Sequence, residues 1–203
     1  MLTIDAYEVT DPAWVRDLVR RVGWGTLVTH GPSGIEASHY PFLLEEAGED
    51  IVLLTHLGKP DDELLDLTGE AMVLIDGPHG YISPSWYPPE QIIPTWNFMS
   101  AHLWGVPELL EPEENYRVLT RLVDEFEAPV EAPSSLRLDE AMTRRVAAAT
   151  TGLRIRVTRF RGKNKLSQDK DPATVRSIVQ HLAGTGPYAN APLARAMSSE
   201  LNL

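Results

Sequence analysis

The stretch D-G-P-H-G-Y-I-S-P-S-W-Y-P-P-E-Q-I-I-P-T-W-N-F-M-S-A-H-L-W-G occupies residues 76–105 and holds three of the chain's five tryptophans, five prolines and two histidines. So many prolines rule out a continuous helix and restrict strands to short or edge segments. The sequence therefore predicts a rigid, mostly extended loop that carries Tyr81, Trp86, Tyr87 and Trp96. Aromatic side chains in such a loop either pack over the core as a lid or line a site for a flat ligand.

Short strands surround this stretch, and helices are more frequent after it. Apolar runs predict strands at residues 25–29, 35–44, 51–55, 71–75, 95–104 and 153–157. Helical spacing with Pro or Asp at the start predicts helices that begin near residues 12, 61, 112, 139 and 172. In the second of them, Leu64, Leu65 and Leu67 are expected to face inward, and in the third, Tyr116, Leu119, Val123 and Phe126 share one face. Pro41 makes the second strand an edge or bulged strand. Because strands and helices do not alternate regularly, we predict an α+β fold, mainly an antiparallel β barrel or sheet with peripheral α helices.

The composition indicates the number of domains and the cellular compartment. The 203 residues show no change of composition along the chain, which predicts one domain with appended helices over residues 1–184 and a tail or short helix over residues 185–203. The absence of cysteine fits a reducing cytoplasm. No signal peptide and no apolar stretch of membrane-spanning length are recognisable.

The net charge of −11 disfavours direct binding to a nucleic acid backbone, which requires clustered Lys and Arg. Several catalytic classes also lack their motifs. No histidine or cysteine spacing supports a metal site, so we expect no metal. The chain has no G-x-S-x-G elbow, no Walker A motif and no G-x-G-x-x-G motif.

The remaining residues suit a ligand with a flat part and an anionic part. Lys59 is the only Lys or Arg between Arg21 and Arg117, and it lies between a strand end and a helix start, where helix N–H groups and the Thr55 hydroxyl favour a phosphate. Further donors and ring faces are expected from Lys163, Lys165, Ser167, Gln168, Asn97, Trp86 and Trp96. Flavin mononucleotide (FMN) meets this description, and so does any other phosphorylated aromatic compound.

Five motifs, in order, carry a resemblance to a known family. They are S-H-Y-P-F-L-L (residues 38–44), T-H-L-G-K-P (55–60), G-P-H-G-Y-I-S-P-S-W-Y (77–87), P-T-W-N-F-M-S-A-H-L-W-G (94–105) and K-L-S-Q (165–168). The chain resembles the PaiB family of FMN-binding negative transcriptional regulators. This resemblance implies the FMN-binding split-barrel fold, a homodimer with flavin sites at the subunit interface, FMN as cofactor, and repression of protease and sporulation genes.

The resemblance also implies which residues bind the flavin. Ser38, His39 and Tyr40 would border the ring, and Thr55, His56 and Lys59 would face the phosphate end. Trp96, Asn97, Lys165, Ser167 and Gln168 would lie near the site, contributed by either subunit. The chain departs from the family pattern at Lys59, which offers a point charge where the family has an arginine fork, and at Asp169, which replaces an Asn.

Three functions remain open at this point. The first is a cytoplasmic flavin-binding regulatory or sensor protein that represses transcription. The second is a flavin-dependent oxidoreductase of unknown substrate, because fold alone does not decide function. The third is an interaction module that has lost its cofactor. Because the chain is acidic and shows no helix-turn-helix, repression would act by an indirect route.

Overall fold

The computed structural model describes residues 4–32, 34–45 and 48–202. Residues 1–3 of the predicted domain and residue 203 of the predicted tail therefore lie outside the described residues. The described chain forms two compact units that interleave in sequence. Unit 1 comprises residues 4–10, 76–101 and 161–202, and unit 2 comprises residues 11–75 and 102–160. The single domain expected from composition stays a prediction.

Antiparallel sheets dominate the fold, as predicted. One sheet has the strand order β1-β10-β7-β6-β2-β3 and the other has the order β4-β5-β9-β8. The strands are β1 (Glu8–Val9), β2 (Trp24–Gly31), β3 (Gly34–Pro41), β4 (Leu43–Leu44), β5 (Val52–Gly58), β6 (Ala71–Ile82), β7 (Thr95–Gly105), β8 (Pro107–Leu109), β9 (Thr150–Arg156) and β10 (Arg159–Lys165). The second sheet belongs wholly to unit 2, whereas β6, β7 and β10 each continue from one unit into the other.

Helices surround the strands. They are α1 (Pro12–Val22), α2 (Asp61–Leu64), α3 (Pro112–Glu127), α4 (Glu140–Ala148), α5 (Pro172–Ala183) and α6 (Ala191–Glu200), with 3-10 turns η1 (Asp5–Tyr7), η2 (Pro84–Trp86) and η3 (Leu136–Leu138). Side-chain N-caps explain several starts, because Asp11, Asp139, Asp171 and Asn190 each accept a backbone N–H of the first turn. Among the described residues, no helix has the length and apolar character needed to cross a bilayer.

The predicted second strand is divided at Phe42. Its first part is β3, which stands at one end of its sheet, and its second part is β4, which belongs to the other sheet. The edge position predicted from Pro41 is therefore confirmed. Phe42 is 1% exposed and donates its backbone N–H to Gly23 O at 3.0 Å, so the chain changes sheets at an anchored residue.

The loop predicted to begin at residue 76 is wrong as far as Ile82, whereas the strand predicted at residues 95–104 is confirmed by β7. Strand β6 continues to Ile82 and β7 begins at Thr95, so Tyr81 and Trp96 lie on strands and the connection is residues 83–94. β2 pairs with β6 only at residues 72–74, and Pro78 lies beyond that stretch. Beyond that stretch a missing N–H costs no hydrogen bond to β2.

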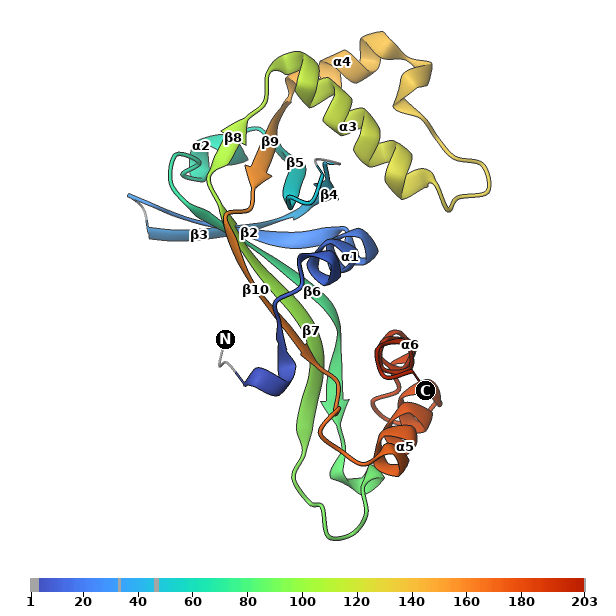
Figure 1. Ribbon diagram of the computed structural model, residues 1–203. Coiled ribbons are helices and arrows are strands. Elements are labelled where there is room, and N and C mark those ends of the chain that lie inside the picture. The colour runs from blue at the N-terminus through green and yellow to red at the C-terminus, as the bar shows by residue number, and fades with distance from the viewer. Residues whose placement is uncertain (1–3, 33, 46–47, 203) are drawn as a thin grey trace. The chain divides into compact units, whose positions relative to one another are not determined.

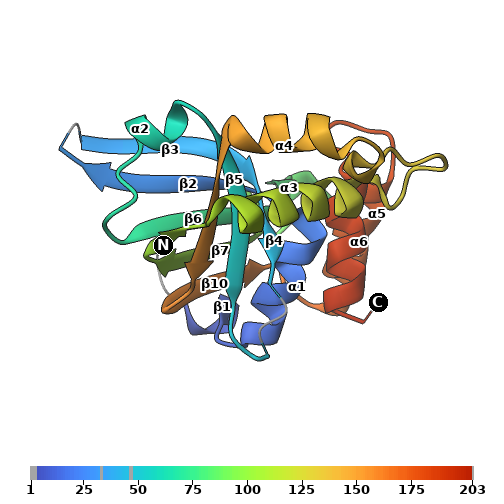
Figure 2. The ribbon, with the colours of Figure 1, turned by 90° about the horizontal axis from the view of Figure 1, so that it is seen from above.

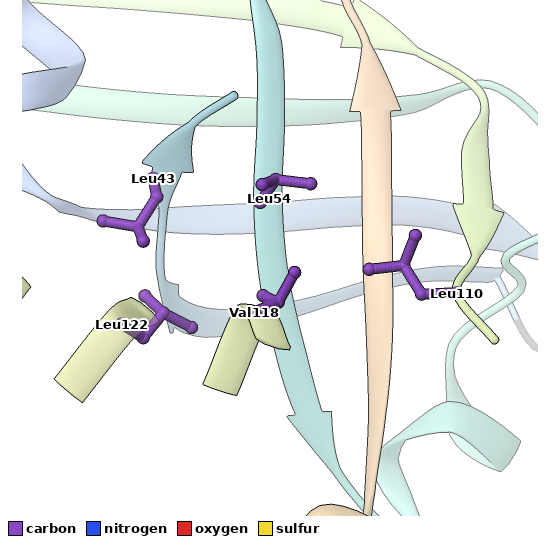
Figure 3. Packing of buried hydrophobic residues seen from close by; sticks show 5 residues of the cluster. All are labelled: Leu43, Leu54, Leu110, Val118 and Leu122. Atoms are coloured by element: carbon purple, nitrogen blue, oxygen red, sulfur yellow. The ribbon is translucent and has the colours of Figure 1, made fainter. Parts of the chain in front are cut away.

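The core of unit 2 lies between α3 and the second sheet. Figure 2 shows α3 crossing β5 and β9, and the three elements are in contact. Figure 3 shows the buried leucines and valine that fill this layer: Leu43, Leu54, Leu110, Val118 and Leu122. Val118 and Leu122 are one helical turn apart, so the same face of α3 supplies both.

In unit 1, α5 and α6 pack side by side (Figure 1). Helix α6 lies in the predicted C-terminal segment and buries Leu193 and Met197 completely. Asn190 donates to His79 O at 2.9 Å, and a Cβ on Gly80 would lie 3.1 Å from Leu193. The glycine on β6 therefore permits the close approach of the C-terminal helix.

Candidate functional site

The structure divides the predicted site residues into one group in each unit. Unit 2 holds Ser38, His39 and Tyr40 on β3, Thr55 and His56 on β5, and Lys59 directly after β5. Unit 1 holds Trp96 and Asn97 on β7, Lys165 at the end of β10, and Ser167 and Gln168 just beyond it. The two groups are described separately below.

The hydroxyls of Tyr40 and Thr55 are engaged inside unit 2. Tyr40 is 6% exposed and donates to Asp61 Oδ2 at 2.7 Å. Burial first, and then the neighbouring Asp61 carboxylate, raises the pKa of Tyr40 to about 12, although a hydrogen bond with Ser38 opposes the rise. Thr55 is fully buried and donates to Pro41 O at 2.6 Å. These contacts join β3, β5 and α2, so both hydroxyl protons already have acceptors within the fold.

His39 presents an exposed ring surface together with a residue that the sequence analysis did not single out. Its imidazole is stacked on Trp24, with ring centroids 6.3 Å apart and an interplanar angle of 15°. His39 Nδ1 lies 2.9 Å from Thr26 Oγ1, and Trp24 is 54% exposed. Because β2 pairs with β3 so that Trp24 faces Pro41, Trp24 is diagonal to His39. Aligning the predicted strands 25–29 and 35–44 as an antiparallel pair would have revealed this contact.

His56 carries a buried ring nitrogen without a partner. Its Nδ1 atom has no hydrogen bond among the described residues, and burial lowers the pKa of its imidazole. His56 faces Gly152 across β5 and β9, and the amide of Asn115 lies over that glycine, where a Cβ would be 2.7 Å from Asn115 Oδ1. Asn115 Oδ1 also lacks a partner in the described chain. The neutral imidazole is thus a donor or acceptor that the fold has left unused.

Lys59 is exposed, and its ammonium donates to Ala148 O at 3.1 Å. The expected phosphate cradle at the following helix is weak, because α2 is only four residues long and its first turn contains Asp61, Asp62 and Glu63. The Glu63 N–H is already bonded to Pro60 O at 2.9 Å. An anion near Lys59 would therefore depend on the ammonium itself rather than on free helix N–H groups.

The K-L-S-Q segment in unit 1 forms a closed hydrogen-bonded turn. Asn97 is fully buried and Ser167 is 1% exposed, and each donates to the other, at 2.9 Å and 3.1 Å. Gln168 accepts from the Leu166 N–H and donates to the carbonyls of Asn164 and Ala6. Ser167 has a φ of 63°, a left-handed conformation that these bonds stabilise. Asn97, Ser167 and Gln168 therefore join β7 to the end of β10.

Lys165 is half-buried in this second cluster, and Trp96 is exposed. The Lys165 ammonium donates to Thr95 Oγ1, and burial lowers the pKa of Lys165, with Asp169 opposing and Lys163 and Lys170 reinforcing that change. Trp96 is 55% exposed and contacts Tyr81 edge-on at 6.2 Å. Trp86 is different, because its ring is stacked on His181 at 5.1 Å and covered on that side.

These residues fit a flavin in part. Exposed ring faces are present at Trp24, His39 and Trp96, an exposed cation is present at Lys59, and His56 offers an unused buried nitrogen. The hydroxyls of Tyr40, Thr55 and Ser167 were expected to contact the ligand, but they donate hydrogen bonds within the chain. Over the part of the chain that the structure describes, no cluster of His, Cys, Asp and Glu is arranged to hold a metal ion.

Comparison with known proteins agrees with this chemistry. A family described as "Putative FMN-binding domain" matches residues 1–159. The chain is also 26% identical over 179 residues to the protease synthase and sporulation protein PAI 2 of Bacillus subtilis, which covers 87% of this chain and 86% of that protein. The resemblance to the PaiB family is therefore confirmed.

Solved structures confirm the fold class. The FAD and heme binding protein of Mycobacterium smegmatis superposes with a TM-score of 0.60 at 18% identity, over 84% of this chain and 79% of that one. A conserved hypothetical protein of Mycobacterium tuberculosis, Rv2991, gives a TM-score of 0.57 at 17% identity, over 80% of this chain and 90% of that one. At these identities the likeness shows a shared split-barrel-like fold alone.

Proposed function

The chain belongs to the FMN-binding domain family, and on that premise we propose that it is a cytoplasmic regulatory protein that senses through bound FMN and acts as a negative regulator of transcription. The observation that carries the proposal is the family match over residues 1–159, which includes every residue of the unit 2 group. FMN is the cofactor that this match supports. The regulatory role is supported by the similarity to the sporulation protein of Bacillus subtilis.

Within unit 2, the proposed flavin contacts follow from exposure and unused donors. The exposed stack of Trp24 and His39 supplies apolar surface for a flat ring, and Lys59 supplies the charge for a phosphate. His56 is a third proposed contact, through the accessible part of its half-buried ring. Ser38, Tyr40 and Thr55 position these groups through β3 and β5.

Within unit 1, Trp96 and Lys165 are the proposed flavin contacts, as an exposed ring and a partly buried amine. Asn97, Ser167 and Gln168 are proposed to position them, because their side chains are bonded to one another and to the backbone. FMN would supply redox chemistry when it is bound to the chain.

Replacing Lys59 with alanine is expected to weaken FMN binding by about 1.5–3 kcal/mol, the usual value of a hydrogen bond to a charged group, or about tenfold to a hundredfold. Riboflavin lacks the phosphate, so its affinity should hardly change. Fluorescence titration of both flavins against both proteins separates the two effects. An equal loss for FMN and riboflavin would show that Lys59 does not contact the phosphate.

We further propose that the protein is a homodimer that represses transcription without binding DNA itself. The exposed Trp24 and Trp96, and Ile35 at 73% exposure, offer apolar surface to a second copy. The net charge of −11 opposes a phosphate backbone. Analytical ultracentrifugation with FMN and a fluorescent promoter duplex should give the mass of a dimer and free DNA. The mass of a monomer would refute the homodimer. Duplex that sediments with the protein despite competitor DNA would refute the absence of DNA binding.

A further inference from the structure

Unit 2 contains a cavity of about 300 Å³ that is lined by none of the proposed flavin residues. It lies where the end of α1, the segment 42–44 and the second half of α3 meet. Its volume is at the lower end of the range of small-molecule sites, about 300–1,000 Å³. The cavity is large enough for a small organic molecule.

The inner wall of this cavity is apolar and buried. Phe42, Leu43 and Leu44 line it and are 1%, 6% and 4% exposed. Figure 3 shows Leu43 on β4 next to Leu122 of α3, so this wall is continuous with the core of unit 2. The ring of Phe126 covers the end of α1, where a Cβ on Gly23 would lie 2.9 Å from it. Phe126 is 47% exposed in front of this wall, so it supplies apolar surface that an occupant would cover.

Arginines outnumber acidic residues in the lining of the cavity, in a chain with a net charge of −11. Arg20, Arg21 and Arg121 line the cavity, and Glu125 is the acidic residue among its lining. Arg21 is paired with Asp17 at 2.8 Å, so the site does not depend on that guanidinium being available. Arg121 is half-buried and donates through one NH2 group to Leu44 O at 2.6 Å.

Arg121 is the residue best placed to recognise an anion. A guanidinium has five N–H donors in a planar fork, and the bond to Leu44 O orients this fork while it leaves other donors available. A carboxylate accepts two parallel hydrogen bonds from such a fork. A phosphate monoester would bring about two negative charges next to Glu125, which disfavours it relative to a singly charged carboxylate.

We propose that this cavity is a second ligand site, which binds a small monocarboxylate with an apolar chain of about six carbons. The carboxylate pairs with Arg121, and the chain lies on Val22 and Phe126, in front of the buried Phe42 and Leu44. Such a site provides a regulatory protein with an input that is independent of the flavin.

Calorimetric titration with hexanoate tests the proposal. Saturable binding of hexanoate is expected, with affinity that rises by about fourfold for each methylene from butyrate to hexanoate, as apolar burial predicts. Hexanol and hexylamine should bind at least about tenfold more weakly, because they lack the charge-assisted pair. Inorganic phosphate, which lacks the chain, should not bind measurably. No saturation below about 10 mM hexanoate, or equal binding of hexanol, would overturn the proposal.

Three variants make the assignment residue-specific. Arg121→Gln should lower hexanoate affinity by at least about tenfold, and Glu125→Gln should raise it by about twofold to fivefold as a repulsive charge is removed. Arg117→Gln is the matched control, because Arg117 lies one turn earlier on α3 with a 72% exposed side chain and does not line the cavity. Its affinity should stay within about twofold of the parent. Since Glu125→Gln is predicted to strengthen binding, misfolding cannot imitate it, and an unchanged affinity in that variant would contradict the proposed geometry.

Discussion

Replacing Leu54 with alanine is expected to lower the free energy of unfolding by about 2–5 kcal/mol, the range for a buried leucine whose neighbours relax only partly. Leu54 is 4% exposed on β5 and lies at the centre of the cluster in Figure 3. Its neighbours come from β4, from α3 and from the residue after β8, so the cavity would open where α3 is held to the second sheet.

Urea denaturation of the purified variant measures this loss. Leu64→Ala is the matched control, because Leu64 on α2 is 68% exposed and its truncation removes little buried surface. That control should change stability by no more than about 0.5 kcal/mol. Similar losses in the two variants would mean that the cluster does not form the core of unit 2.

Replacing Arg154 with methionine is expected to cost about 2–3 kcal/mol of folding free energy. Arg154 on β9 is 17% exposed and donates to both carboxylate oxygens of Glu45 at 3.0 Å and to Glu114 at 3.2 Å, with Glu108 at 3.6 Å. Removing the guanidinium leaves these acids together without a cation, which costs about 3–5 kcal/mol when fully buried. We expect less because the acids are 30–66% exposed.

A double variant identifies the cause of that loss. Arg154→Met combined with Glu45→Gln should regain about 1 kcal/mol, because one of the uncompensated charges is gone. The exposed pair of Arg117 with Glu113, at 3.8 Å, provides the control, and Arg117→Met should cost under about 1 kcal/mol. If the double variant is less stable than Arg154→Met, charge repulsion is not the reason for the effect.

The class of fold follows from the sequence, because apolar runs and turn residues locate most strands. The local sequence pattern does not predict strand ends or buried faces that depend on contacts between distant parts of the chain. The prolines around Tyr81 predicted a loop, yet β6 runs to Ile82, and its Pro78 lies beyond the stretch paired with β2. Leu64 was expected to face inward together with Leu65, yet Leu64 is 68% exposed and only Leu65, directly after α2, is buried.

The buried face of α3 shows a second limit. Apolar spacing predicted a face of Tyr116, Leu119, Val123 and Phe126. Leu119 is buried as predicted, but Phe126 is 47% exposed, and the other buried residues include Asn115, Val118 and Leu122. The buried face of α3 differs from the predicted apolar face because it includes a polar residue. Asn115 is buried and donates to the carbonyls of Ala147 and Thr150, contacts that no apolar pattern can reveal.

The sequence predicts which residues belong to the candidate site, but it does not predict what each of their side chains does. Motifs indicated which residues to examine, and the family match includes most of them. Hydrogen-bond partners decide what each one does, and those partners are distant in sequence. Ser167 is bonded to Asn97, and Thr55 to Pro41, so both hydroxyls support the fold. Trp24 was missed because its contact with His39 depends on strand register.

Titration of the purified, flavin-free protein with FMN tests the central claim most directly. We predict saturable quenching of flavin fluorescence at one FMN per chain, with a dissociation constant of about 1 μM or lower, and a visible absorption band displaced from that of free FMN. Flavin fluorescence that stays unchanged in the presence of excess protein would contradict the claim that this chain is an FMN-binding protein.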